Sequence, residues 1–93
     1  MGVMQKLKRA LIEMYQDGEL EKILKYTKGS QKRAVKHDIK VIEGVVSYYE
    51  SHNKDLNSFS VFSFIMALRS AQVLTNALCY MERYEEEGKK YAK

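Results

Sequence analysis

Apolar residues recur at intervals of three and four along most of this chain, the spacing that places them on one face of an α-helix. The pattern predicts a first helix over residues 3–15 and a short second helix over 19–26. A glycine lies in the break after each segment, and glycine readily adopts the positive φ that ends a helix. Ser30 is a good N-cap residue and predicts the start of a third helix. The buried stripe expected for that helix is Val35, Ile39, Ile42 and Val46.

Residues 45–62 allow two interpretations. Their β-branched and aromatic side chains are typical of strands, yet Val46 and Tyr49 also continue the stripe of the third helix. A turn at 52–55 is expected in either case. It is followed either by a returning strand, which would complete a two-stranded hairpin, or by a helix capped at Ser58 or Ser60.

The C-terminal part has the longest uninterrupted helical pattern. No glycine or proline occurs in residues 64–87, and the sequence predicts one unbroken helix over 64–90. The 24 residues of 64–87 alone, at about 1.5 Å each, give a helix of about 36 Å, which is longer than a domain of this size can cover. The simplest partner for the remainder is the same helix of a second copy, packed antiparallel or crossed. The residues expected in this homodimer interface are Phe64, Leu68, Ala71, Leu74, Leu78 and Met81.

The composition is that of one mainly α-helical domain spanning residues 1–93. Hydrophobic residues make up 45% of the chain and charged residues 30%, and there is no proline. The single cysteine, Cys79, has no partner for an internal disulfide, which favours a reducing, cytoplasmic location. The most apolar stretch, residues 59–68, is too short to span a bilayer, so no membrane association is expected.

Positive charge is concentrated in one segment. Residues 25–40 contain six cations and one anion, Asp38, a balance of +5, whereas the whole chain carries +4 and the remainder therefore −1. Cations gathered on one element are typical of a protein that meets a polyanion. The alternative is a solvated basic face that serves only solubility.

The segment from Leu20 to Ile42 combines a short helix, a turn containing Gly29 and a cation-rich helix, and it resembles the helix-turn-helix unit of DNA-binding proteins. With the preceding helix and the possible hairpin as a wing, residues 3–62 resemble a winged-helix domain followed by a dimerisation helix. In length and charge the chain is also similar to the small centromere-binding proteins of archaeal plasmid partition systems. The residues that carry the helix-turn-helix likeness are Ile23, Leu24, Gly29, Val35 and Ile39.

The resemblance implies that the helix beginning at Ser30 enters the major groove of double-stranded DNA as a recognition helix. Gln31 and Arg33 would read base edges, and the lysines would follow the phosphates. The implied role is transcriptional regulation or binding of a plasmid centromere, with a partition or regulatory protein as a further partner. The residues expected to bind DNA are Lys28, Ser30, Gln31, Lys32, Arg33, Lys36, His37, Lys40 and, at the tip of the wing, Asn53 and Lys54.

No group of residues has the composition or spacing of a catalytic site. His37 and His52 are isolated from other metal-binding side chains, so no metal, no cofactor and no enzymatic activity are predicted. The competing hypothesis is a small helical protein–protein adaptor, or an inhibitor of viral or mobile-element origin. In that case, the basic segment would meet an acidic protein surface.

Overall fold

The protein is mainly helical in the computed structural model, which describes the backbone of residues 2–91 and the side chains of residues 2–85. No strand occurs within that part of the chain. The elements are α1 (Val3–Gln16), α2 (Glu19–Tyr26), α3 (Ser30–Ser51), a 3-10 helix η1 (Leu56–Ser58), α4 (Val61–Ala67) and α5 (Ala71–Tyr91).

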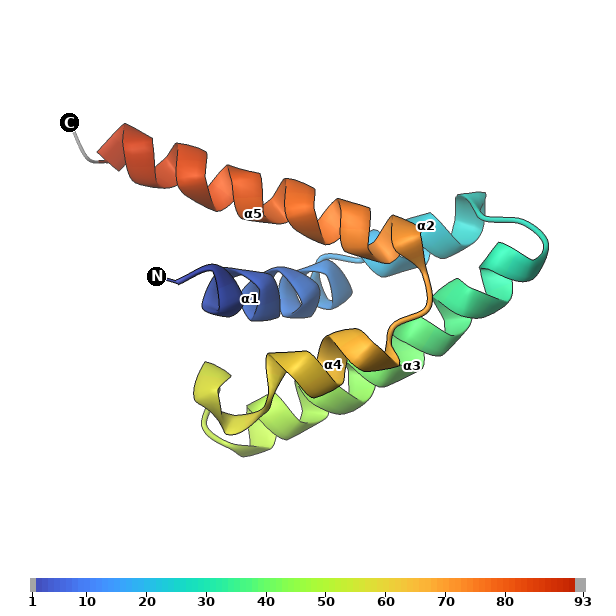
Figure 1. Ribbon diagram of the computed structural model, residues 1–93, viewed down its shortest axis with the longest axis horizontal. Helices are drawn as coiled ribbons and strands as arrows, with labels where there is room; N and C mark the ends of the chain where they lie inside the picture. The colour runs from blue at the N-terminus through green and yellow to red at the C-terminus, as the bar shows by residue number, and fades with distance from the viewer. Residues whose placement is uncertain (1, 92–93) are drawn as a thin grey trace.

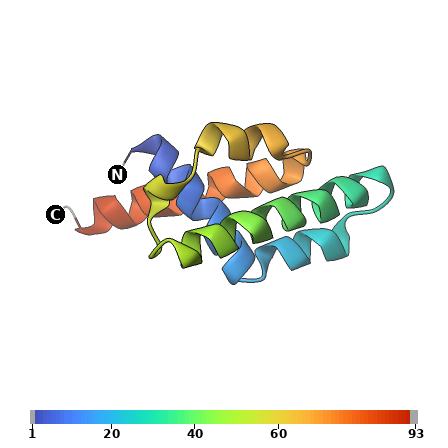
Figure 2. The same ribbon diagram turned by 90° about the horizontal axis from the view of Figure 1, so that it is seen from below.

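Helix α1 is the centre of the fold and packs against all the other helices. In Figure 1 it lies between α5 on one side and the pair of α3 and α4 on the other. Figure 2 shows α2 folded back along the first half of α3. Leu11 and Met14 of α1 are fully buried, and they join Leu20, Val35, Ile42, Phe64 and Val73 in one core. Each amphipathic helix thus buries one stripe against α1 or its neighbours.

The first three predicted helices are confirmed. Gly18 and Gly29 both have positive φ, 80° and 69°, at the breaks where the sequence predicted them. Val35, Ile42 and Val46 are buried as expected, while Ile39 is partly buried.

The predicted wing at residues 45–62 is absent from the structure, because α3 continues to Ser51. Val45 and Tyr49 pack against the core from α3, so burial on the helical stripe prevails over the preference of these residue types for strands. The turn at 52–55 is present, and the Asp55 side chain accepts a bond from Asn57 N at 2.9 Å that starts η1. Ser60 is the N-cap of α4, one of the two alternatives that the sequence left open.

The predicted unbroken helix over 64–90 is also wrong, because the chain leaves helical geometry at Leu68–Ser70 and divides into α4 and α5. Asp38 of α3 accepts bonds from Arg69 N at 2.8 Å and from Ser70 N at 2.7 Å. Ser70 Oγ in turn accepts from Val73 N at 3.3 Å, which caps the first turn of α5. The break is therefore stabilised from another helix, not by a residue that breaks helices.

Polar contacts fasten α5 along α1 in antiparallel order. Tyr84 donates a hydrogen bond to Glu13, and Tyr80 donates one to Asp17 at 3.3 Å. Burial, together with these carboxylates, raises the pKa of both tyrosines above its ordinary value of 10.0. None of the helices among the described residues has both the length and the apolar composition needed to cross a membrane.

Candidate nucleic-acid interface

The turn between α2 and α3 projects at one end of the molecule, away from both ends of the chain (Figure 1). Thr27 N donates to Ile23 O at 3.0 Å as α2 ends, and Gly29 takes a conformation that L side chains rarely adopt. Gly29 is also the N-cap of α3, and no side chain caps that helix. The turn is thus short and fixed, and it presents the first residues of α3 to solvent.

All the cations of residues 25–40 are exposed, and they lie at the end of α2, in the turn or in the first half of α3. Elsewhere, some cations form ion pairs, such as Arg9 with Glu13 at 2.8 Å and Lys6 with Glu85 at 3.7 Å, although Lys22 and Arg69 form none with a described side chain. By contrast, among the residues whose side chains are described, none of the cations of this segment forms an ion pair within 4.0 Å. We call this set the basic face; its members are Lys25, Lys28, Lys32, Arg33, Lys36 and Lys40.

The one anion of the same segment is buried. Asp38 is fully buried, and its two carboxylate oxygens are occupied by backbone N–H groups of the α4–α5 break. His37, partly exposed, lies with its Nδ1 at 3.1 Å from Asp38 Oδ1. The charge that the segment shows to solvent is therefore positive throughout.

A shallow hollow of about 530 Å³ separates α2 from α3 on this face. Arg33, Lys36 and Lys40 line it, and Leu24 and Ile39 contribute apolar surface. Glu21 and Glu43 also line the hollow, yet neither comes within ion-pair distance of a described cation. The two acids moderate the positive field at the edges of the basic face without neutralising any one cation.

Most of the residues that the sequence proposed for DNA binding lie in one part of the chain, although not all on one side of α3: Arg33, Lys36 and Lys40 line the hollow between α2 and α3, whereas Lys28 and Gln31 do not. Lys28, Ser30, Gln31, Lys32, Arg33, Lys36 and Lys40 are exposed in the turn or in the first half of α3, and His37 is partly exposed beside them.

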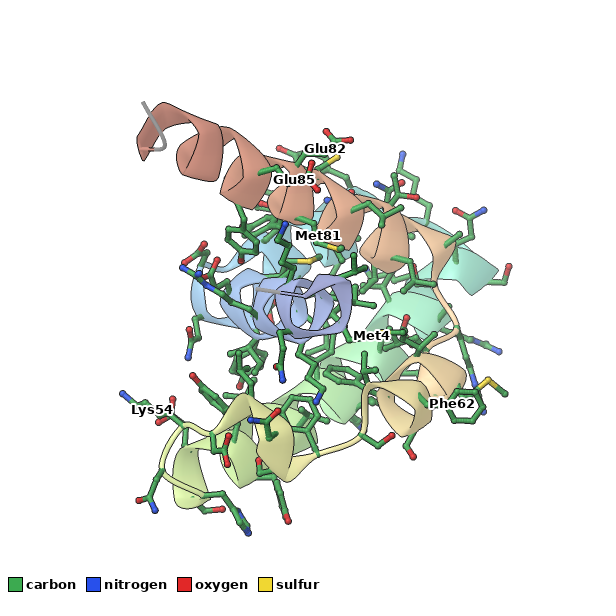
Figure 3. All side chains as sticks on the ribbon, turned by 60° about the vertical axis from the view of Figure 1, so that its left-hand side comes forward. Met4, Lys54, Phe62, Met81, Glu82 and Glu85 are labelled. Carbon is green, nitrogen blue, oxygen red and sulfur yellow. The ribbon has the colours of Figure 1, made fainter. Side chains whose placement is uncertain are left out.

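Asn53 and Lys54 do not belong to this group. They follow the other end of α3, whose 22 residues at about 1.5 Å each amount to about 33 Å. Both adopt positive φ, 60° and 57°, in the turn before η1, and Lys54 Nζ lies 4.0 Å from Glu50. Figure 3 shows Lys54 pointing outward at that end. The wing that was expected to bring them close to Lys28 is absent, so the two groups lie at opposite ends of α3.

The predicted dimer stripe is likewise divided. Phe64, in α4, is 3% exposed and belongs to the core of its own chain, and Leu68 lies in the break and packs against that core. The buried residues described on α5 are Val73, Ala77 and Tyr80, none of which belongs to the predicted stripe. Ala71 and Leu78 are exposed, and Leu74 and Met81 are partly exposed. Leu74, Leu78 and Met81 remain as an apolar strip along α5, which we call the outer strip; Leu78 is its exposed member, and Met81 also packs against the core.

The sequence analysis did not predict the role of Asp38, which was counted only as the one anion of residues 25–40. The signal was present, because Asp38 stands three residues after Val35 and four before Ile42, on the buried stripe itself. A carboxylate at a core position must find donors, so its spacing predicted a buried polar contact.

No cluster of three or more histidine, cysteine or acidic side chains in the described residues could hold a metal ion. No protein-family model matches the chain, and the comparisons with curated proteins and with solved structures give no match either.

Proposed function

We propose that this protein binds double-stranded DNA as a homodimer, with the basic face on the phosphate backbone. The observation that carries the proposal is the set of exposed cations that form no ion pair with any acid whose side chain is described, while the anion among them is buried. Cations already engaged in ion pairs would have to exchange one partner for another, whereas these cations are available at no such cost. When these cations neutralise DNA phosphates, counterions condensed on the DNA are released, and this release favours association at low salt.

The arrangement of the basic face suits an extended polyanion. Lys32, Lys36 and Lys40 are four residues apart, so they follow one another along the helix at about 6 Å intervals. Such a row can follow one phosphate strand. Lys28, in the turn, extends the face around the start of α3.

Helix α3 is the candidate for reading bases. Its first residues project from the body, and the major groove, about 12 Å wide, admits a single helix. Arg33 suits the O6 and N7 edge of guanine, and Gln31 suits adenine. We therefore assign Arg33 and Gln31 to base contacts and Lys36 to backbone contacts.

Dimerisation is proposed through the outer strip of α5. Leu78 is 56% exposed and stands between Leu74 and Met81 along the helix. In an antiparallel pair centred on Leu78, Leu74 of one copy faces Met81 of the other, so one strip satisfies both sides of a two-fold interface.

A fluorescence anisotropy titration with duplex DNA at several salt concentrations tests the proposal. With about 6 phosphates neutralised per protomer, log K should fall against log salt with a slope of about −5. Lys36→Ala should reduce that slope by about 0.9 and weaken binding to every sequence alike. Arg33→Ala should instead narrow the difference in affinity between a preferred site and random DNA.

The matched control is Lys54→Ala, which removes a lysine from the other end of α3 and should leave both the slope and the affinity unchanged. Equal losses from Lys36→Ala and Lys54→Ala would show that only net charge matters and would overturn the assignment of the basic face. Binding of an acidic protein surface in place of duplex DNA, with retention of DNA only at low salt, would indicate the adaptor function.

A further inference from the structure

A second hollow adjoins the basic face on the side of α5. It has a volume of about 700 Å³ and lies between α2, the start of α3 and α5. A smaller hollow of about 360 Å³ shares Thr27, Gln31 and Gln72 with it and continues to Arg69. Together they form a groove about the α2–α3 turn, and we call it the turn groove. Its chemistry differs from that of the basic face, because it combines an aromatic ring, side-chain amides and cations.

The aromatic ring is Tyr26, at the last position of α2. Its side chain lines the hollow and is 77% exposed, the largest exposed fraction of any bulky apolar or aromatic side chain described. Leaving an aromatic ring so exposed forgoes the stabilisation that its burial would give. A flat exposed ring beside cations is a platform on which an unpaired nucleic-acid base can stack.

The amides are held in a chain of hydrogen bonds across α2 and α5. Asn76 Nδ2 donates to Glu19 Oε1 at 3.1 Å, and Gln72 Nε2 donates to Asn76 Oδ1 at 2.7 Å. The chain orients Gln72 and leaves its Oε1 acceptor and one N–H donor for another group. A donor and an acceptor side by side are what the edge of a base requires.

Cations lie at both ends of the turn groove. Lys22 and Lys28 line the larger hollow, and Arg69 lines the smaller one. All three side chains are exposed, and none of them forms an ion pair with another described side chain. The carboxylate of Glu19, the acid in this lining, is engaged by Asn76.

We propose that the turn groove binds a short single-stranded segment of nucleic acid, with a base stacked on Tyr26 and its edge on Gln72. Lys22, Lys28 and Arg69 hold the phosphates on either side. The inference rests on the proposed function, because Lys28 belongs to both surfaces and Gln31, which lines the groove, is also the residue proposed to contact bases of the duplex. It adds that the preferred ligand is a duplex next to unpaired nucleotides, not an uninterrupted duplex.

The test compares three DNA probes at one salt concentration: a blunt duplex, the same duplex with a short single-stranded tail, and the same tail made of abasic nucleotides. The abasic tail keeps the phosphates and lacks the bases. We expect the wild type to bind the tail with bases about tenfold more tightly than the abasic tail. Tyr26→Ala should abolish that difference and leave binding to the blunt duplex unchanged, whereas Tyr26→Phe, which keeps the ring, should preserve it.

Two further variants separate the parts of the groove. Arg69→Ala should weaken binding of both tails, because it removes a phosphate contact, and should spare the blunt duplex. Tyr48→Ala removes an exposed tyrosine near the far end of α3, where the ring stacks on His52, and should change none of the three affinities.

Equal wild-type affinities for the two tails would overturn the turn groove as a site for bases, as would a Tyr26→Ala variant that weakens blunt and tailed probes alike. Failure of the proposed function would give a different result. Binding of the blunt duplex would then lack the expected salt dependence, whatever the affinities for the two tailed probes.

Discussion

At the scale of single residues, the fully buried Asp38 has the widest structural effect. Its carboxylate satisfies the backbone N–H groups of Arg69 and Ser70, which would otherwise be donors without partners where α5 begins. The same contact sets where α5 starts and so positions Arg69 at the end of the turn groove. A buried polar side chain on α3 thereby links the packing of the core to the surface beside the basic face.

Asp38→Asn should lower the free energy of unfolding by about 2 kcal/mol, measured by urea denaturation. The replacement keeps the size of the side chain, but its NH₂ group would face a backbone N–H donor that now has no acceptor. Asp38→Ala should cost more, about 3 kcal/mol, because both donors lose their acceptor and a cavity is left. Asp55→Asn, a change at an exposed cap of η1, is the control and should cost well under about 1 kcal/mol.

Tyr84 should make stability sensitive to alkaline pH. Its pKa is raised in the folded protein by burial and by the hydrogen bond to Glu13, so the folded state holds the hydroxyl proton more tightly than the unfolded chain. The stabilisation is fully present below the ordinary tyrosine pKa of 10.0 and is lost as the pH rises above it.

Tyr84→Phe should therefore lower the free energy of unfolding by about 1 kcal/mol at neutral pH and give a shallower decline above pH 10. Urea denaturation of both proteins across that pH range provides the measurement. Tyr26→Phe removes a hydroxyl from an exposed ring and should match the wild type at neutral pH. A Tyr84→Phe curve parallel to that of the wild type above pH 10 would contradict the linkage.

At the scale of elements, helices with a clear stripe and a glycine break were predictable from the sequence. The bounds of α2 coincide with the predicted segment, and α3 begins at the predicted Ser30. The second half of α3 was not decidable, because Val45 and Tyr49 suit a strand locally and a helix by their spacing. Only the core against which they pack selects the helix, and that core includes residues distant in sequence.

The break between α4 and α5 shows a different limit. Residues 64–87 contain neither proline nor glycine, so no local residue predicted an interruption. Ser70 can cap a helix, but a serine in a helical pattern is ambiguous without the acceptor that Asp38 supplies from 32 positions away. The division also changes which side of α5 is buried, and for this reason the predicted dimer stripe is partly internal.

At the scale of the whole molecule, the sequence could predict that cations gather on one element, but not which distant residues join them. Lys54 was grouped with Lys28 on the assumption of a wing, and the helical path of α3 separates them. The sequence did not predict that Arg69 and Gln72 lie beside the α2–α3 turn, because only the packing of α5 brings them there. Clusters made within one helix were therefore predictable, whereas those assembled from several helices required the fold.

The outer strip of α5 should determine the oligomeric state of the protein. Leu78→Lys places a charge at the centre of the proposed two-fold interface, where it would have to be desolvated against its own copy. Sedimentation equilibrium should give the wild type twice the 10.8 kDa of one chain, and the variant a mass that approaches one chain.

Met66→Lys is the matched control for this variant, since Met66 is 70% exposed, belongs to α4 and is not part of the outer strip of α5. It should leave the mass of the dimer unchanged. Circular dichroism should show both variants folded, because neither side chain belongs to the core. A wild type that remains at the mass of one chain at all concentrations would exclude the homodimer. Two phosphate-binding faces would then no longer act together, and the affinity of a single protomer for DNA should depend less steeply on salt.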